Sequence, residues 1–252
     1  LIDAIESRIR AAADRGAMGR LIYLGAGTSG RLGVLDASEC PPTFQTDPNM
    51  VVGIIAGGDA SLRRSSEGME DDPKGAHAEL DRLPVGAHDT VVGIAAGATT
   101  PYVLGALEHA RARGALAVFL TCSPGPTPPG VDYHIAIDTG PEVVTGSTRM
   151  KAGTATKMAL NIITTTLMVR LGKVYENLMV DLRASNAKLR DRAARIVATL
   201  CSIDRAGALS LLDAAGGSAK VATVMGLRGC RREEAERLLT AAKGRLRDAL
   251  SA

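Results

Sequence analysis

Short, uninterrupted apolar runs that alternate with helical stretches are the feature that most limits what this chain can fold into. We expect strands at residues 21–24, 51–55, 90–95, 117–121 and 134–137. Between and before them, helical patterns cover residues 1–14, 32–38, 59–70, 74–82 and 102–113. Strands that are apolar at every position are buried on both faces, as in a parallel sheet covered by helices. The pattern predicts an α/β fold, a parallel sheet between helices in a three-layer sandwich.

The second half of the chain is predominantly helical. A Pro-rich loop at 123–131 precedes the last strand, and a long helix is expected from about 148 to 171, with Gly172 as its stop. Beyond it, short helical patterns are punctuated by glycines. We therefore expect a first domain over residues 1–200 and a small helical domain over 204–252.

Composition excludes several classes of protein. The net charge of +3 is spread along the chain without a basic block, and aromatic residues make up only 2%, so neither nucleic acid nor a membrane surface is an expected partner. The four cysteines and four histidines are scattered, which predicts neither a metal site nor disulfides and fits the cytoplasm. No apolar run has the length of a membrane helix, and because the chain begins at Leu1 we expect a segment before it.

A glycine-rich turn, Gly25-Ala26-Gly27-Thr28-Ser29-Gly30, follows the first strand and precedes a helix. Backbone N–H groups and the helix N-terminus favour an anion there, and the hydroxyls of Thr28 and Ser29 suit a phosphomonoester. The same letters also fit a dinucleotide fingerprint, but the expected acid about 20 residues further on is missing, since the first acid after the second strand is Asp59. A third possibility is a turn with a purely structural role. Of the three, we favour a binding site for a phosphomonoester.

Two clusters of carboxylates follow the first two strands. Glu39 precedes Pro41-Pro42, which we expect to end the helix, and the negative end of a helix dipole favours a protonated acid. Glu70 lies in an acidic run at 67–72, where mutual repulsion also favours protonation of one group. Taken alone, each cluster is more simply a solvated surface, but together they suggest an acid/base pair.

The segment 145–151, at the start of the long helix, holds further candidates. Ser147 or Thr148 can cap the helix, and the same hydroxyls can contact a sugar. Lys151 can reach a phosphate or a hydroxyl. No GxSxG motif or catalytic triad is present, which argues against serine and cysteine hydrolases.

Together, these motifs resemble those of the N-acetylmuramic acid 6-phosphate etherase family, which has the phosphosugar isomerase (SIS) fold. The similarity is carried by residues 21–33, 35–43, 55–58, 145–154 and 177–181. It covers nearly the whole chain, including the tail, which resembles a small UBA-like helical bundle. The vertebrate glucokinase regulatory protein shares several of these motifs.

The resemblance implies a cytoplasmic, homodimeric, cofactor-free lyase of cell-wall sugar recycling. Its substrate would be N-acetylmuramic acid 6-phosphate, and its products N-acetylglucosamine 6-phosphate and D-lactate. The two acid/base residues fall on Glu39 and Glu70. The phosphate contacts fall on Gly27, Thr28 and Ser29.

One segment departs from the family pattern. After the third strand the family reads Ser-Gly-Arg-Thr, whereas this chain reads Gly97-Ala98-Thr99-Thr100. A hydroxyl and a guanidinium are therefore replaced, while Thr100 matches and is expected to contact the substrate. This change favours a second hypothesis, a non-catalytic sugar-phosphate sensor, and a third is a sugar-phosphate isomerase of the same fold.

Overall fold

The computed structural model describes residues 1–65, 67–182 and 186–251. Its contacts divide the chain into two compact units. The first comprises Leu1–Cys40 and Asp47–Thr164, and the second comprises Pro41–Thr46 and Thr165–Ala252. Each unit has its own hydrophobic core and is described by itself.

A parallel five-stranded sheet forms the centre of the first unit. Its order is β2-β1-β3-β4-β5, made of β1 (Leu21–Gly25), β2 (Val51–Ile55), β3 (Thr90–Ala95), β4 (Leu116–Thr121) and β5 (Tyr133–Ala136). Every residue of β1, β3 and β4 is buried. The predicted parallel sheet is confirmed because these strands are apolar on both faces.

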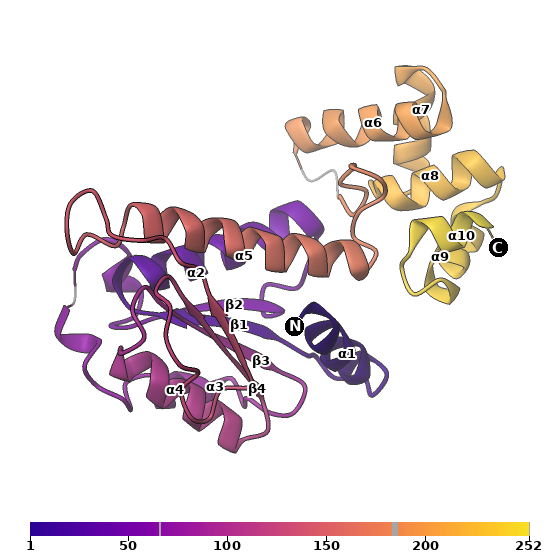
Figure 1. The fold of residues 1–252 in the computed structure, drawn as a ribbon. Coiled ribbons are helices and arrows are strands. Elements are labelled where there is room, and N and C mark those ends of the chain that lie inside the picture. Colours follow the sequence, from indigo (N-terminus) through magenta and orange to yellow (C-terminus); the bar gives the residue numbers. More distant parts are fainter. Residues whose placement is uncertain (66, 183–185, 252) are drawn as a thin grey trace. The chain divides into compact units, whose positions relative to one another are not determined.

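Helices cover both faces of this sheet (Figure 1). On one face lie α2 (Gly27–Phe44) and α5 (Lys151–Arg170), and on the other α3 (His77–Arg82) and α4 (Pro101–Ala112). A further helix, α1 (Ile2–Ala13), precedes the first strand. The three-layer α/β fold expected from the sequence is therefore confirmed.

The direction of winding changes between β1 and β3. The strand that follows β1 in sequence, β2, pairs with one edge of β1, and the next strand, β3, pairs with its other edge. The connections that leave β1 and β3 therefore run in opposite directions across the sheet. In open parallel sheets, ligands bind in the crevice at this point, outside the carboxyl ends of the strands. The glycine-rich turn after β1 and the loop holding Thr100 after β3 both lie there.

The expected end of α2 is wrong. The helix continues through Pro41 and Pro42 and ends at Phe44, where Gln45 has a left-handed φ of 51° and its N–H donates to the Pro41 carbonyl. The two prolines remove donors from the ladder but lie in the last turns, so the helix survives their loss. Glu39 therefore lies inside α2, and the dipole argument for its protonation no longer applies.

Two other helices are shorter than expected. Within 59–65 and 67–70, the described part of the expected helix, the chain forms the 3₁₀ turns η1 (Asp59–Leu62) and η2 (Glu67–Met69) and no α-helix, and the side chain of Glu67 lies outside the described structure. The expected helix at 74–82 begins only at His77. By contrast, the stop after α5 is confirmed, since Gly172 has a φ of 80°.

The second unit is a bundle of short helices. They are α6 (Ala187–Cys201), α7 (Arg205–Ala214), α8 (Ala219–Arg228), α9 (Arg232–Ala241) and α10 (Leu246–Ser251). A division at 200–204 would leave α6 outside this core, whereas Ala193 and Val197 are fully buried within it. The small-domain core therefore includes α6.

Across the described residues, no helix combines the length and apolar character that crossing a membrane requires.

Candidate active site

A cavity of about 240 Å³ lies at the point where the sheet changes direction. Its walls come from the turn after β1, the loop after β3, the acidic loop before α3 and the segment before α5. The lining includes six of the residues predicted from sequence, namely Gly27, Thr28, Ser29, Glu70, Thr100 and Thr148. The fold thus gathers groups that are far apart in sequence.

The shape of the turn after β1 depends on its glycines. A Cβ on Gly25 would lie 2.9 Å from the Ile94 carbonyl oxygen, and one on Gly30 would lie 2.5 Å from the Gly25 carbonyl oxygen. Gly27 has a left-handed φ of 51° with open space where a side chain would stand. Two glycines therefore allow the strand and helix to approach closely, and the third leaves the backbone open to a ligand.

Two helices begin at this cavity. The helix α2 starts at Gly27, and α4 starts at Pro101 with Thr100 as its N-cap residue. The Thr100 side chain does not cap the helix, so its hydroxyl is not committed to that role. Helix N-termini carry partial positive charge and exposed N–H donors. The cavity therefore favours an anionic group such as a phosphate.

Glu70 is held at this cavity by its backbone. The Tyr102 N–H, in the first turn of α4, donates a 3.0 Å hydrogen bond to the Glu70 carbonyl. Further along the same loop, the Pro73 carbonyl lies directly against Gly105 of α4, and Gly75 lies against the Tyr102 ring. Glu70 lines the cavity, and its side chain is exposed to solvent.

The start of α5 differs from the expectation that Ser147 or Thr148 caps it. The carboxylate of Glu142 accepts from the N–H groups of Lys151 at 2.9 Å and Ala152 at 3.0 Å. These backbone hydrogen bonds lower the pKa of Glu142. A carboxylate suits a helix N-terminus better than a hydroxyl because it also meets the dipole charge.

Only part of this segment reaches the cavity. Thr148 lines it, and Gly153 of α5 lies close to the Thr28 side chain. Lys151 instead directs its Nζ to the Pro141 carbonyl at 3.1 Å. Neither Ser147 nor Lys151 is among the residues that line the cavity.

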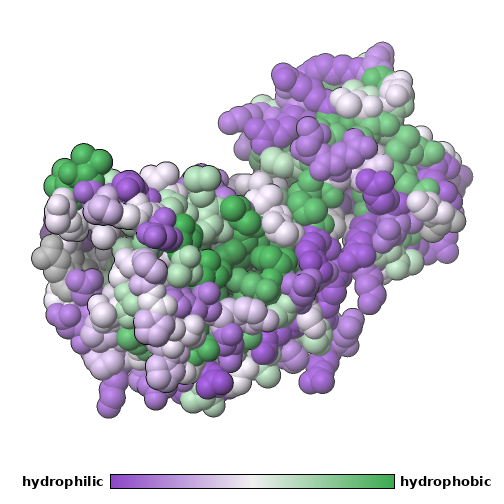
Figure 2. Space-filling view, in the orientation of Figure 1, coloured by the Kyte–Doolittle hydropathy of each residue, from purple (hydrophilic) through white to green (hydrophobic). Residues whose placement is uncertain are grey.

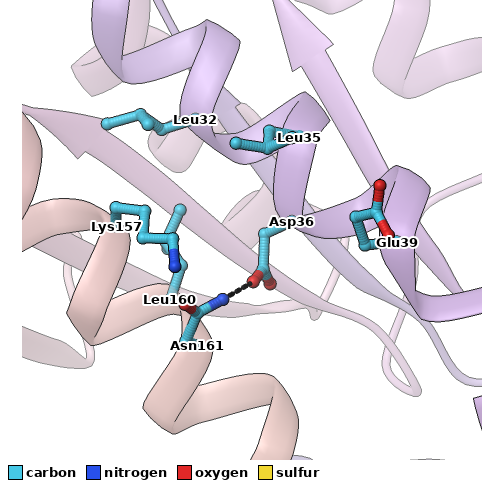
Figure 3. Close-up of a pocket in the computed structure, with 7 residues that line it drawn as sticks. All are labelled: Leu32, Leu35, Asp36, Glu39, Lys157, Leu160 and Asn161. Carbon is cyan, nitrogen blue, oxygen red and sulfur yellow. Dashed lines mark hydrogen bonds between the residues drawn. The ribbon is translucent and has the colours of Figure 1, made fainter. Parts of the chain in front are cut away.

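Glu39 lines a different cavity, of about 210 Å³, between α2 and α5 (Figure 3). Leu32, Leu35, Asp36 and Glu39 come from α2, and Lys157, Leu160 and Asn161 come from α5. Within one chain the structure therefore does not place Glu39 in the cavity of Glu70, as the predicted acid/base pair requires.

Asp36 is a buried carboxylate at this second cavity that sequence reasoning did not single out. Its Oδ1 accepts from Asn161 Nδ2 at 2.7 Å and from Thr164 Oγ1 at 3.4 Å. Burial raises the pKa of Asp36, an effect that these hydrogen bonds oppose. An acid inside a helical motif gives no signal of burial until the partner helix is known.

The two buried cysteines, Cys40 and Cys122, do not compete as catalytic groups. Burial raises the pKa of Cys40 to about 12 and also raises that of Cys122, which leaves both as neutral thiols. No cluster of three or more His, Cys, Asp and Glu side chains suited to a metal occurs within the described parts of the chain.

Comparison with known proteins gives matches along the whole chain. Residues 1–111 match the family model of the glucokinase regulatory protein N-terminal SIS domain. Relatives named N-acetylmuramic acid 6-phosphate etherase include one from Parasynechococcus marenigrum, 55% identical over 99% of this chain and 78% of its own length. The relative from Gloeobacter violaceus is 60% identical over 86% of this chain and 71% of its own. The relative from Rubrobacter xylanophilus is 53% identical over 99% of this chain and 80% of its own length.

Proposed function

Because the chain belongs to the N-acetylmuramic acid 6-phosphate etherase family, we propose that its cavity at the sheet switch point binds the substrate and that Glu39 and Glu70 transfer the protons. The protein is a carbon–oxygen lyase that cleaves the lactyl ether of N-acetylmuramic acid 6-phosphate in amino sugar recycling. The products are N-acetylglucosamine 6-phosphate and D-lactate.

The observation that carries the site assignment is the meeting of Glu70 with the turn of Thr28 and Ser29 in one cavity. We place the phosphate on this turn, where the N-termini of α2 and α4 stabilise its charge. Thr100 and Thr148 then face the sugar. Contact of Ser147 and Lys151 with the substrate stays a prediction, because both stand outside the cavity lining.

The proposed chemistry needs two carboxyl groups in opposite protonation states. In the open-chain aldehyde, the C2 proton is acidic because it neighbours the carbonyl. Glu70 removes it, the C2–C3 double bond forms, and the C3–O bond to lactate breaks as Glu39 protonates the departing oxygen. Water then adds at C3 and a proton returns to C2. Each group acts by general acid–base catalysis, without a cofactor or metal in this scheme.

We also propose that the protein works as a cytoplasmic homodimer. Large apolar side chains are exposed on the outer helices of the first unit, including Leu35 (48% exposed), Met158 (60%) and Ile162 (63%). Figure 2 shows hydrophobic surface gathered over α5. A contiguous exposed apolar surface of this kind favours association, here with a second copy. Sedimentation at micromolar concentration tests it, and a fully active monomer would overturn it.

A regulatory, non-catalytic reading has one supporting observation, the match of residues 1–111 to the regulatory protein's domain. That match covers less of the chain than the similarity to the etherases. Release of D-lactate from N-acetylmuramic acid 6-phosphate separates the two readings, because a sensor binds the sugar phosphate without releasing lactate.

The residue assignment is tested by Glu39→Gln and Glu70→Gln. Each should lower turnover by about 10²–10⁴ while ligand binding persists, since only proton transfer is removed. Glu233→Gln, on α9 of the second unit, is the matched control and should keep full activity. If neither glutamate in the first unit affects lactate release, the assignment fails although the activity stands.

The bond that breaks is tested by isotopes. In heavy-oxygen water, the label should enter the sugar at C3, and in deuterium oxide, deuterium should enter at C2. Heavy oxygen in the lactate would mean that the other C–O bond is cleaved, and the elimination scheme would be wrong.

A further inference from the structure

The Arg31 side chain ties helix α2 to the loop that leads to Glu70. Arg31 lies near the N-terminus of α2, about one helical turn after Thr28 of the turn assigned to the phosphate. Its Nε donates to the Leu62 carbonyl at 3.2 Å, and its Nη2 donates to the Arg64 carbonyl at 3.2 Å. The planar guanidinium presents its donors in a fixed fork, so it can hold two acceptors of one loop together.

The two carbonyls lie where a short helical turn ends. Leu62 is the last residue of η1, and the Arg64 N–H returns to the Ala60 carbonyl at 3.2 Å. Carbonyls at the end of a helical turn carry partial negative charge and need donors from elsewhere. The Arg31 cation meets both needs, and it thereby fixes the backbone at the point where the chain leaves η1 for the acidic run 67–72.

The chain around Glu70 is thus held from the two helices that begin at the cavity. Arg31 of α2 holds the loop before Glu70, and the Tyr102 N–H of α4 holds the Glu70 carbonyl itself at 3.0 Å. These helices cover opposite faces of the sheet (Figure 1), so the loop passes from one face to the other between its anchors. The Tyr102 anchor is a backbone group, whereas the Arg31 anchor is a side chain that a substitution can remove.

Arg31 is not placed to bind the substrate itself. It is not among the described residues that line the cavity, and the two donors named above are directed to the loop. A general role in stability is shared by other arginines that bond a backbone carbonyl. Arg8 of α1 is an example in the same unit, since its Nη1 donates to the carbonyl of Ala87, in the connection before β3 at the opposite end of the strands. Arg8 therefore matches Arg31 in chemistry but not in place.

We propose that Arg31 is a positioning residue for the lyase reaction: it holds the loop at Leu62 and Arg64 so that Glu70 lies at a set distance from the bound phosphate. This inference rests on the proposed function, in which Glu70 removes the C2 proton. One end of α2 then supplies the phosphate turn and, through Arg31, one anchor of the loop that bears the base. Displacement of a reacting group by about 1 Å can lower a rate by about 100-fold.

Arg31→Ala tests this role. It should lower kcat for lactate release by about 10- to 100-fold, because the loop loses its anchor on α2. The affinity for N-acetylglucosamine 6-phosphate in calorimetry should stay near that of the wild type. Arg31→Lys should recover part of the lost kcat, since an ammonium can donate to the carbonyls but lacks the fork of a guanidinium. Arg8→Ala is the matched control and should keep kcat near that of the wild type.

A double-mutant cycle with Glu70→Gln separates positioning from a general loss of stability. If Arg31 acts through Glu70, adding Arg31→Ala to Glu70→Gln should change kcat little, because the carboxylate that Arg31 positions is already gone. If Arg31→Ala lowers kcat by the same factor in both backgrounds, the two residues act independently and the proposal is wrong. Should Arg31→Ala not fold, the same cycle with Arg31→Lys decides between these outcomes.

The outcomes separate this inference from the proposed function. If Glu70→Gln keeps full activity, the role of Glu70 fails, and the positioning role of Arg31 falls with it. If Glu70→Gln is strongly impaired while Arg31→Ala keeps the wild-type kcat, positioning by Arg31 is wrong and the assignment of Glu70 stands. Weaker binding of the sugar phosphate with an unchanged kcat would also overturn the proposal, because Arg31 would then act on the substrate and not on the loop.

Discussion

The backbone N–H of Tyr102 donates a 3.0 Å hydrogen bond to the carbonyl of Glu70 and so ties the acidic loop to the first turn of α4. The helix that supplies one wall of the cavity thereby also sets the position of the Glu70 backbone. Tyr102 itself is 2% exposed, so this anchor belongs to the core.

Gly105→Ala should loosen this arrangement. A Cβ at Gly105 would collide with the Pro73 carbonyl, which belongs to the backbone and cannot rotate away. We expect a loss of about 1–3 kcal/mol in unfolding free energy from overpacking, partly offset by about 1 kcal/mol of helix propensity. Turnover should fall with the shift of Glu70. Gly68→Ala, in the same loop with open space around it, is the control and should leave denaturation and lactate release near wild type.

Gly97→Ser should strengthen phosphate binding. Gly97 lines the cavity, and a Cβ there meets nothing within 4 Å, so a hydroxyl can be added without a clash. A hydrogen bond to a charged group contributes about 1–3 kcal/mol, and part of this should appear as tighter sugar-phosphate binding in calorimetry. Ser29→Ala should change affinity in the opposite direction by a similar amount. Unchanged affinity in both variants would place the phosphate elsewhere.

Asp36→Asn should make unfolding less dependent on pH. Burial raises the folded-state pKa of Asp36 above its unfolded value, so its contribution to stability is present at low pH and is lost as pH rises through the folded pKa. The variant should therefore gain stability relative to wild type as pH rises from the unfolded-state pKa of about 4 through the raised folded-state pKa, and then level off. Its Oδ1 can still accept from Asn161.

The check for Asp36 is urea denaturation across this pH range. Asp36→Ala, which lacks the acceptor, should be destabilised at every pH and separates the hydrogen bond from the titration. A constant difference between Asp36→Asn and wild type across the range would contradict the prediction.

Lys220→Met should destabilise the second unit. Lys220 is 6% exposed, and its Nζ donates to the Gly172 carbonyl at 3.0 Å and the Gly244 carbonyl at 2.9 Å, and pairs with Asp181 at 3.0 Å. Removing the cation leaves the two carbonyls and the Asp181 carboxylate without this partner, which should lower the free energy of unfolding by about 3–5 kcal/mol. Lys173→Met breaks the more exposed pair with Asp181 and should cost less than about 1 kcal/mol. Equal costs in chemical denaturation would refute the special role of Lys220.

The sequence alone determined the sheet and the glycine-rich turn after its first strand. The strands at 51–55 and 90–95 have the bounds predicted for them, because short continuous apolar runs favour strands in a sheet that helices cover on both faces. Gly25 and Gly30 could be recognised because close strand–helix approach demands glycine wherever it occurs. Long motifs likewise indicated the etherase family before any contact was known.

Tertiary structure decided which distant groups meet. Local rules ended α2 at Pro41, but the helix continues to Phe44. Local rules also expected Ser147 or Thr148 to cap α5, whereas Glu142 reaches its first N–H groups from a preceding loop. Glu39 and Glu70 suggested one acid/base pair in sequence, yet a rigid helix carries Glu39 to another cavity. Sequence patterns report the preferences of neighbours along the chain, whereas distances across the molecule depend on how whole helices pack.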